Sequence, residues 1–279
     1  MPFVESDGAR IYYEVRGSGS PLLLIESWGY SSWMWFRQLD AFSREHACVV
    51  FDNRGVGLSD KPDEPYTVAL MAKDAINVLR AAGFDKAHVL GVSLGGFIAQ
   101  ELAISWPELV MSLVLVSTSC GVRGVPMPLE TFKVLNLPKG TMPLREWLKM
   151  RLLPAFSEQF VNEHPDVVER VLDLYIANRP PAHAVWRQAQ AAAAFDSLDR
   201  LDRIRAPTLI IAGSDDRAVP AGNAKILHER IPNSRLVLFK GCGHLLFVEK
   251  PDAFNELVLR FLKSVDEGCP ELEPKYMEI

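Results

Sequence analysis

The sequence of 279 residues has few cysteines and no excess of basic residues. Each of these shortages argues against particular classes of protein. The four cysteines, Cys48, Cys120, Cys242 and Cys269, are scattered and form no C-x-x-C pair. We therefore expect reduced thiols in a cytoplasmic protein rather than a disulfide framework. The formal net charge of −5 gives no electrostatic reason to expect nucleic acid or an anionic membrane as a partner.

Membrane and targeting signals are also missing from the sequence. No apolar run approaches the ~20 residues that a membrane-spanning helix needs. The first residues lack the basic start and apolar middle of a secretory signal, and no internal repeat is visible. With 48% hydrophobic and 23% charged residues, the composition is that of an ordinary soluble globular protein with ample core.

What the chain does contain is an alternation of short apolar runs and helical segments. Because most of the runs are continuously apolar, they favour a mostly parallel sheet with helices on both faces. With an opening hairpin, we predict eight strands, over residues 2–6, 9–16, 21–25, 48–51, 87–90, 113–116, 208–212 and 234–239. Helices of this part of the chain are predicted over residues 32–43, 68–82, 222–230 and 251–264.

The pattern changes between residues 120 and 199, where no β-branched run appears and prolines separate helical segments. Helices are expected there over residues 145–153, 165–177 and 182–195. We therefore predict an α/β core of residues 1–119 and 200–265 that is interrupted by a helical cap, residues 120–199. Residues 266–279 are predicted to be an extended or frayed tail.

The stretch Gly91-Val92-Ser93-Leu94-Gly95-Gly96 lies between a predicted strand and a predicted helix. A turn this sharp forces the serine into a strained backbone conformation, and a side chain at Gly91 or Gly95 would crowd it. The hydroxyl of Ser93 is then exposed, and N–H groups of the helix start lie where negative charge would develop on a substrate. Taken alone, the pattern also fits a strand-to-helix turn without chemistry, so its partners matter.

Two later strand ends carry residues that could activate this serine. In a sheet of parallel strands, sites form at the carboxyl ends of the strands. Asp215 and Asp216 follow one predicted strand, and His244 follows the next. A serine hydroxyl needs a base to take its proton, and the base needs an anion that fixes its tautomer.

With these residues in place, the sequence resembles the α/β-hydrolase superfamily over residues 1–265. The resemblance rests on the serine turn and on three further stretches, Asp52-Asn53-Arg54-Gly55-Val56-Gly57-Leu58-Ser59, Gly213-Ser214-Asp215-Asp216 with Pro220, and Gly241-Cys242-Gly243-His244. It implies an α/β-hydrolase fold with Ser93 as nucleophile, His244 as general base and acid, and Asp216 as orienting acid. Asp216 is preferred to Asp215 because the family acid stands three residues after the glycine and four before a proline.

The resemblance also implies two donors for an oxyanion hole. The first is the N–H of Leu94, directly after the nucleophile. Family members usually carry His-Gly after the strand that ends at Ile25, whereas this chain has Glu26-Ser27. Aligning Glu26-Ser27-Trp28-Gly29 with the usual His-Gly-x-Gly makes the N–H of Trp28 the second donor.

Glu26 is therefore a departure from the family pattern, and a buried carboxylate there has to be neutralised or paired. The expected partner is Arg54, in an ion pair that holds the Trp28 loop in place. The alternative is that Glu26 faces the substrate and selects for a polar or cationic group, or positions water.

A serine nucleophile favours acyl chemistry, since family members that cleave carbon–halogen bonds and epoxides use an aspartate. We predict a carboxylesterase or lactonase that acts on a small, largely apolar ester or lactone through an acyl-enzyme intermediate. Enol-lactone hydrolases of this superfamily also carry other residues in place of the His-Gly pair. The resemblance therefore gives a modest hint toward lactones. A slowly turning-over small-molecule receptor with this fold, and a carbon–carbon bond hydrolase, remain open as alternatives.

No cofactor or metal ion is expected. A nucleotide site is not expected, because there is no G-K-[ST] and no third glycine three residues after Gly57 in the Gly55-Val56-Gly57 stretch. No His, Asp or Glu cluster has the spacing of metal ligands. The expected partner is a small-molecule substrate, and the expected state is a monomer or homodimer. Five further histidines are expected to be structural or solvated, namely His46, His88, His164, His183 and His228.

Overall fold

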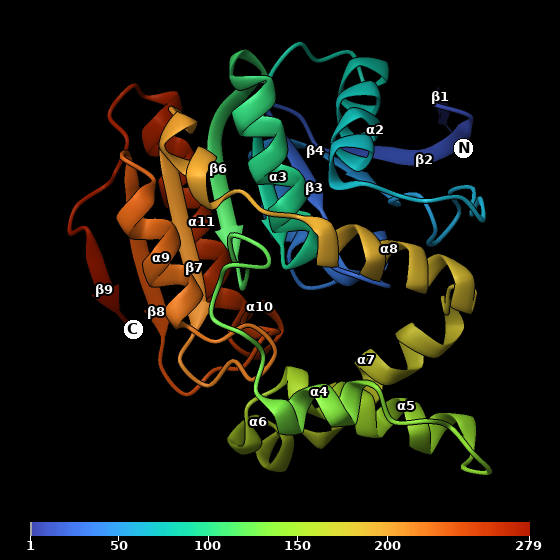
Figure 1. The fold of residues 1–279 in the computed structure, drawn as a ribbon. Helices are drawn as coiled ribbons and strands as arrows, with labels where there is room; N and C mark the ends of the chain where they lie inside the picture. The colour runs from blue at the N-terminus through green and yellow to red at the C-terminus, as the bar shows by residue number, and fades with distance from the viewer. Residues whose placement is uncertain (1) are drawn as a thin grey trace.

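A nine-stranded sheet runs through the protein, in the strand order β1-β2-β4-β3-β5-β6-β7-β8-β9. The structure, a computed structural model, describes residues 2–279, and helices cover both faces of the sheet (Figure 1). The strands are β1 Phe3–Ser6, β2 Ala9–Arg16, β3 Ser20–Ile25, β4 His46–Phe51, β5 Ala87–Val92, β6 Val110–Val116, β7 Thr208–Gly213, β8 Ser234–Phe239 and β9 Tyr276–Glu278.

The sheet is parallel from β4 to β9, and β1 and β2 form an antiparallel edge beside β4. β2 runs antiparallel to both β1 and β4, while the strand pairs from β4–β3 through β7–β8 are parallel. Every residue of β4, β5, β7 and β8 is buried, which explains their continuous apolar runs. The predicted α/β-hydrolase fold, a mostly parallel sheet with helices on both faces, is confirmed.

The predicted count of eight strands is wrong by one, because the tail supplies β9. Tyr276 pairs with Leu236 and Glu278 with Leu238, so the tail adds a parallel strand beside β8. A three-residue strand carries too little apolar pattern to stand out in a sequence. Its pairing covers the edge that β8 would otherwise leave open.

The helices that flank the sheet pack in two layers (Figure 1). Each layer buries a cluster of hydrophobic side chains against the sheet. On one face the helices that contribute include α2, α3 and α9, and on the other face they include α1, α10 and α11. These helices are α1 Leu39–Phe42, α2 Val68–Ala81, α3 Leu94–Ser105, α9 Gly222–Arg230, α10 Leu246–Glu249 and α11 Pro251–Asp266.

The prediction of a single helix over residues 32–43 is also wrong. The chain instead forms a 3-10 turn, Ser32–Trp35, followed by the short α1. Each piece is held by a long-range hydrogen bond. Ser32 N–H donates to Asp52 at 2.8 Å, and Gln38 Nε2 donates to the carbonyl of Phe247 at 2.8 Å. These tertiary contacts override the local helical spacing.

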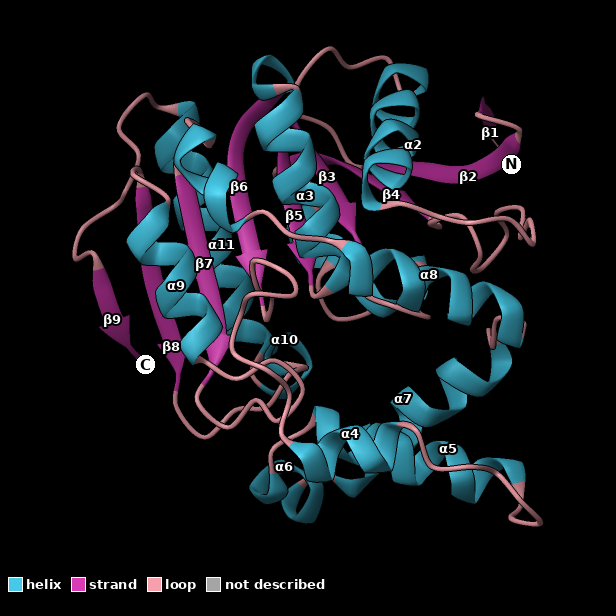
Figure 2. Cartoon of the chain, viewed as in Figure 1, coloured by secondary structure: helices cyan, strands magenta, loops and turns pink. Residues whose placement is uncertain are grey.

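Five α-helices lie between β6 and β7, and α4–α7 stand at the end of the sheet toward which the strand arrows point (Figure 2). The short helices α4 and α6 were not expected from the sequence. Within residues 2–279, no helix is long and apolar enough to cross a membrane. The five helices are α4 Leu129–Leu135, α5 Leu144–Leu152, α6 Glu158–Glu163, α7 Pro165–Ala177 and α8 Ala182–Ala194.

Candidate active site

Ser93 lies between the end of β5 and the start of α3, with backbone angles φ 55° and ψ −114°. A positive φ is strained for a residue with a side chain and costs about 1–3 kcal/mol. The neighbouring glycines are needed for space. A Cβ on Gly91 would lie 2.2 Å from the carbonyl oxygen of Gly95, and one on Gly95 would lie 2.2 Å from that of Ile25. The sequence-based reason for these glycines therefore agrees with the geometry.

The end of β6 braces this turn. Ser93 N–H donates to the carbonyl of Val116 at 3.0 Å, and Thr118 Oγ1 donates to the carbonyl of Ser93 at 2.8 Å. The Thr118 side chain also fills the space beside Gly96, where a Cβ would lie 2.5 Å from its Oγ1. The serine backbone is thus fixed on both sides while its side chain stays partly exposed.

His244 and Asp216 form a buried pair at the ends of β8 and β7. His244 Nδ1 lies 2.8 Å from Asp216 Oδ2, and the carboxylate is fully buried. The other oxygen of Asp216 accepts the N–H groups of Ala218 and Val219, each at 2.8 Å. Asp215 is exposed and accepts only the hydroxyl of Ser214 within the described chain. The structure therefore brings Asp216, and not Asp215, against His244.

The same strand end that braces Ser93 also holds the histidine loop. Ser117, with φ 47°, donates its hydroxyl to the carbonyl of His244 at 2.9 Å. Within residues 2–279, no hydrogen bond joins Ser93 Oγ to His244. Catalytic hydrogen bonds are commonly long before substrate binds and tighten in the complex.

The two predicted oxyanion donors, the N–H groups of Leu94 and Trp28, both lie at this end of the sheet. Leu94 is the first residue of α3, so its N–H has no partner inside the helix. Neither N–H donates to another group within residues 2–279. Trp28 is anchored by its indole N–H, which donates to the carbonyl of Val185 on α8 at 2.8 Å.

Gln188 of α8 is a site residue that the sequence reasoning missed. It is fully buried, accepts the N–H of Gly29 at 2.9 Å, and donates to the carbonyl of Arg54 at 2.9 Å. It therefore joins the Trp28 loop, the loop after β4 and the inserted helices. The available signal was a glutamine within an alanine-rich helix, which by itself does not separate a buried bridge from a solvated side chain.

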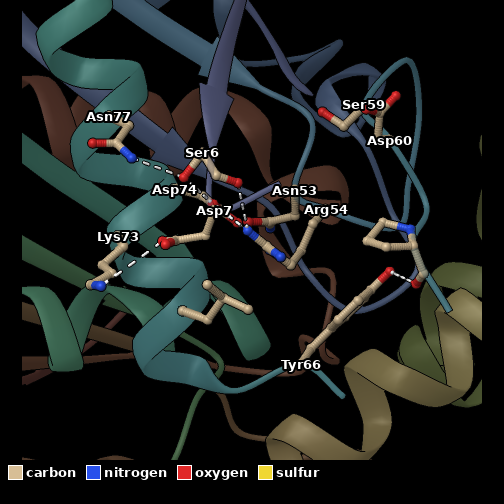
Figure 3. A network of polar contacts seen from close by, with 12 residues as sticks. Ser6, Asp7, Asn53, Arg54, Ser59, Asp60, Tyr66, Lys73, Asp74 and Asn77 are labelled. Carbon is tan, nitrogen blue, oxygen red and sulfur yellow. Dashed lines mark hydrogen bonds and ion pairs between the residues drawn. The ribbon is translucent and has the colours of Figure 1, made fainter. Parts of the chain in front are cut away.

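The predicted ion pair between Glu26 and Arg54 is wrong. Arg54 pairs instead with Asp74 of α2, with Nε–Oδ2 2.5 Å and Nη2–Oδ1 2.7 Å, and also donates to the carbonyl of Ser6 (Figure 3). Both charged side chains are buried. Asp74 occupies the inward face of an amphipathic helix, where helical spacing alone predicts an apolar residue, and that mismatch was the missed signal.

Glu26 itself has no cationic partner among residues 2–279. It is fully buried, and one carboxyl oxygen accepts the N–H of Asn53. The other oxygen, Oε2, has no hydrogen-bond partner within the described chain. Burial, and next the negative charge of Asp52, raise the pKa of Glu26 well above its ordinary value. Of the two outcomes expected for this carboxyl, neutralisation is therefore the one that the geometry favours.

The Glu26→Gln variant is accordingly expected to become more stable than wild type as the pH rises. The raised pKa means that folded Glu26 holds its proton at pH values where the unfolded chain has lost it. Its contribution to stability is full below the ordinary carboxyl pKa and is lost as the pH rises toward the folded pKa. Glutamine cannot lose a proton, so the variant should gain stability relative to wild type as the pH rises from 5 to 8.

Melting temperatures of both proteins across this pH range measure the effect. Glu256→Gln, at an exposed position of α11, is the matched control. A parallel pH dependence for wild type and Glu26→Gln would show that Glu26 is not held neutral.

Glu249 is a second residue that the sequence reasoning missed. Its Oε1 accepts the N–H of Ser157 at 2.9 Å and that of Gly243 at 3.0 Å, and its Oε2 accepts the hydroxyl of Ser157 at 2.8 Å. Gly243 precedes His244, and Ser157 is the N-cap of α6. Burial raises the pKa of Glu249, while these hydrogen bonds act in the opposite direction. The carboxyl thus links the histidine loop to the inserted helices.

The sequence is similar to known proteins over most of its length. The family profile described as alpha/beta hydrolase fold matches residues 20–251. A curated relative from Azorhizobium caulinodans, RutD, is named as a candidate carbamate hydrolase. It is 32% identical to this chain, and the match covers 96% of this chain and 100% of the relative.

Two solved structures are similar along nearly the whole chain. One is described as Est816, an N-acyl homoserine lactone degrading enzyme, with 31% identity, a TM-score of 0.81, and coverage of 93% of this chain and 100% of that one. The other is a hydrolase from Pseudomonas aeruginosa PA01, with 32% identity, a TM-score of 0.82, and coverage of 94% and 97%.

Proposed function

Because the chain belongs to the α/β-hydrolase fold family, we propose that it is a serine hydrolase of small, largely apolar carboxylic esters or lactones. The observation that carries the proposal is the 2.8 Å pair between His244 and Asp216 at the sheet end where Ser93 stands on its strained turn. A buried carboxylate at this distance holds the imidazole in the tautomer whose Nε2 accepts a proton.

The proposed reaction runs in two halves through an acyl-enzyme. Ser93 Oγ forms a bond to the substrate carbonyl carbon while its proton passes to His244 Nε2. The carbonyl–oxygen bond to the alcohol then breaks, and His244 returns the proton to the leaving oxygen. Water, deprotonated by the same histidine, releases the acid and restores the serine.

The N–H groups of Leu94 and Trp28 are proposed to bind the oxyanion that forms in both halves. Loss of one such donor costs about 10²–10³ in kcat in other serine hydrolases. The support for Trp28 is the anchoring of its loop to α8 through Val185 and Gln188. We also propose that residues 120–199 act as a cap over a core of residues 1–119 and 200–265.

Carbamates are a second candidate substrate class. The observation that favours them is the 32% identity with the RutD relative over that protein's full length. A carbamate carbonyl would be attacked by the same serine and would release an alcohol or amine. The lactone-degrading enzyme is matched at 31% identity and supports the cyclic-ester candidate.

A substrate panel tests the proposal. It contains p-nitrophenyl esters of graded acyl length, a set of lactones, aryl carbamates and a carbon–carbon cleavage substrate, assayed without added metal. We expect repeated turnover of esters or lactones. Binding with almost no multiple turnover would favour the receptor alternative, and cleavage confined to the carbon–carbon substrate would replace the proposal.

Glu249→Leu is expected to lower kcat by about 100-fold, because a misplacement of about 1 Å at a catalytic group has this effect. Leucine removes all three acceptor contacts to Gly243 and Ser157. Glu249→Gln keeps one carbonyl oxygen for the two N–H donors and should restore most of the rate. Steady-state kinetics well below both melting temperatures separate the two variants. Equal rates for leucine and glutamine would remove the positioning role.

A further inference from the structure

A second group of titratable side chains gathers at the opposite end of the sheet from Ser93. His46 is the first residue of β4, His88 lies near the start of β5, and Asp266 is the last residue of α11. One ligand atom from each of the three lies within 4.8 Å of the other two. The hydrolase proposal makes no use of this cluster.

The spacing of its atoms is close to that of a metal site. His88 Nε2 lies 3.0 Å from Asp266 Oδ1. Bonds of about 2.0–2.2 Å to a tetrahedral zinc ion place neighbouring ligand atoms about 3.3 Å apart. Separations that involve Asp266 can adjust, because this residue stands at a helix end with 32% of its side chain exposed. That exposure also gives an ion a path to the two buried imidazoles.

Outer contacts orient the three ligands. The hydroxyl of Ser112 lies 2.8 Å from His88 Nδ1 and can accept that N–H when Nε2 serves as a ligand. The hydroxyl of Ser20 lies 2.9 Å from His46 Nδ1 and 2.6 Å from Asp266 Oδ2, so it bridges these two side chains.

We propose that His46, His88 and Asp266 bind one divalent transition-metal ion of the zinc class. Two imidazoles and one carboxylate suit zinc, cobalt or nickel, whereas magnesium and calcium prefer oxygen ligands alone. The ion would tie the end of α11 to the starts of β4 and β5, apart from the hydrolytic end of the sheet. Its role is therefore structural.

Titration of the chelator-treated full-length protein with zinc chloride, followed by calorimetry, tests the site. We expect one equivalent to bind with micromolar or tighter affinity and to raise the melting temperature. Magnesium chloride should do neither. Cobalt chloride should give the absorption bands of a low-coordinate nitrogen and oxygen site. The absence of saturable zinc binding would overturn the proposal.

Matched variants locate the ion. Asp266→Asn keeps a side chain that can bond to Ser20 and should weaken zinc binding at least about 100-fold, as should His88→Gln. Ser112→Ala should weaken it about 10–100-fold, the usual effect of losing an outer-shell partner. His183→Gln, at an exposed histidine outside the cluster, should leave it unchanged.

One equivalent retained at full affinity in the Asp266 and His88 variants would place the ion elsewhere and overturn the proposal. Since the readout is binding and not ester turnover, this result is independent of the proposed hydrolysis.

Discussion

Asp216→Asn is expected to lower kcat by about 10⁴-fold, the loss seen when the acid of a model triad becomes an amide. With its amide oxygen held by the N–H groups of Ala218 and Val219, asparagine presents an N–H₂ group to His244 Nδ1, which lies 2.8 Å from the present carboxylate. The imidazole is then held in the tautomer whose Nε2 carries a proton, so it cannot accept one from Ser93. The N–H groups of Ala218 and Val219 can still bond to the amide oxygen, which preserves the loop.

Asp215→Asn provides the matched control, since it makes the same change one residue earlier at an exposed position. It should change kcat by less than about 3-fold, because the Asp215 carboxylate bonds only to the Ser214 hydroxyl in the described chain. Steady-state rates of both variants on the best substrate of the panel measure the contrast. Equal or reversed losses would show that the acid has been assigned to the wrong residue.

Ser93→Ala is expected to lower kcat by on the order of 10³-fold or more while leaving the fold intact. Alanine removes the attacking oxygen but keeps a Cβ at the positive φ, so the strain of the turn is unchanged. The backbone contacts to Val116 and Thr118 are also kept. The residual rate comes from the oxyanion donors and from binding.

The rates of Ser93→Ala and wild type can be compared only if the variant still folds and binds substrate. The melting temperature of Ser93→Ala should stay close to that of wild type, and substrate should still bind. A full ester or lactone rate in this variant would remove the nucleophile from the account. A collapsed melting temperature would instead show that the side chain is needed to form the turn.

Much of the fold follows from local patterns in the sequence. β8 spans the predicted residues, and α7 and α9 begin and end where helical spacing and prolines place them. Gly91 and Gly95 were expected to be required by the serine turn, and the short distances around them give the physical reason. Such features depend on a few consecutive residues, so periodicity and turn chemistry suffice.

The missed features depend on residues far apart in the chain. Asp74 captures Arg54 because packing brings α2 against the loop after β4, and no local pattern reports that contact. Glu249 and Gln188 bind backbone groups of distant loops and leave no motif in the sequence. The cluster of His46, His88 and Asp266 was not predicted for the same reason. Its three residues are far apart in the sequence and lie close together only in the folded structure.

The candidate site lies between these two cases. The positions of Ser93, Asp216 and His244 could be predicted because each follows a recognisable strand, and parallel strands end at one edge of the sheet. The environment of Glu26 could not, because the raised pKa of this carboxyl depends on full burial and on the nearby charge of Asp52. Roles assigned to the triad and to the two oxyanion donors remain predictions until they are measured.

The most direct test of the central claim is mass spectrometry of the protein after reaction with a fluorophosphonate, a reagent that labels activated serines. The account predicts one label per chain, carried by the peptide that contains Ser93. Labelling should be lost in Ser93→Ala and slowed strongly in Asp216→Asn, but not in Asp215→Asn. A label on a different residue, or an unlabelled Ser93 in protein that turns over esters, would contradict the account.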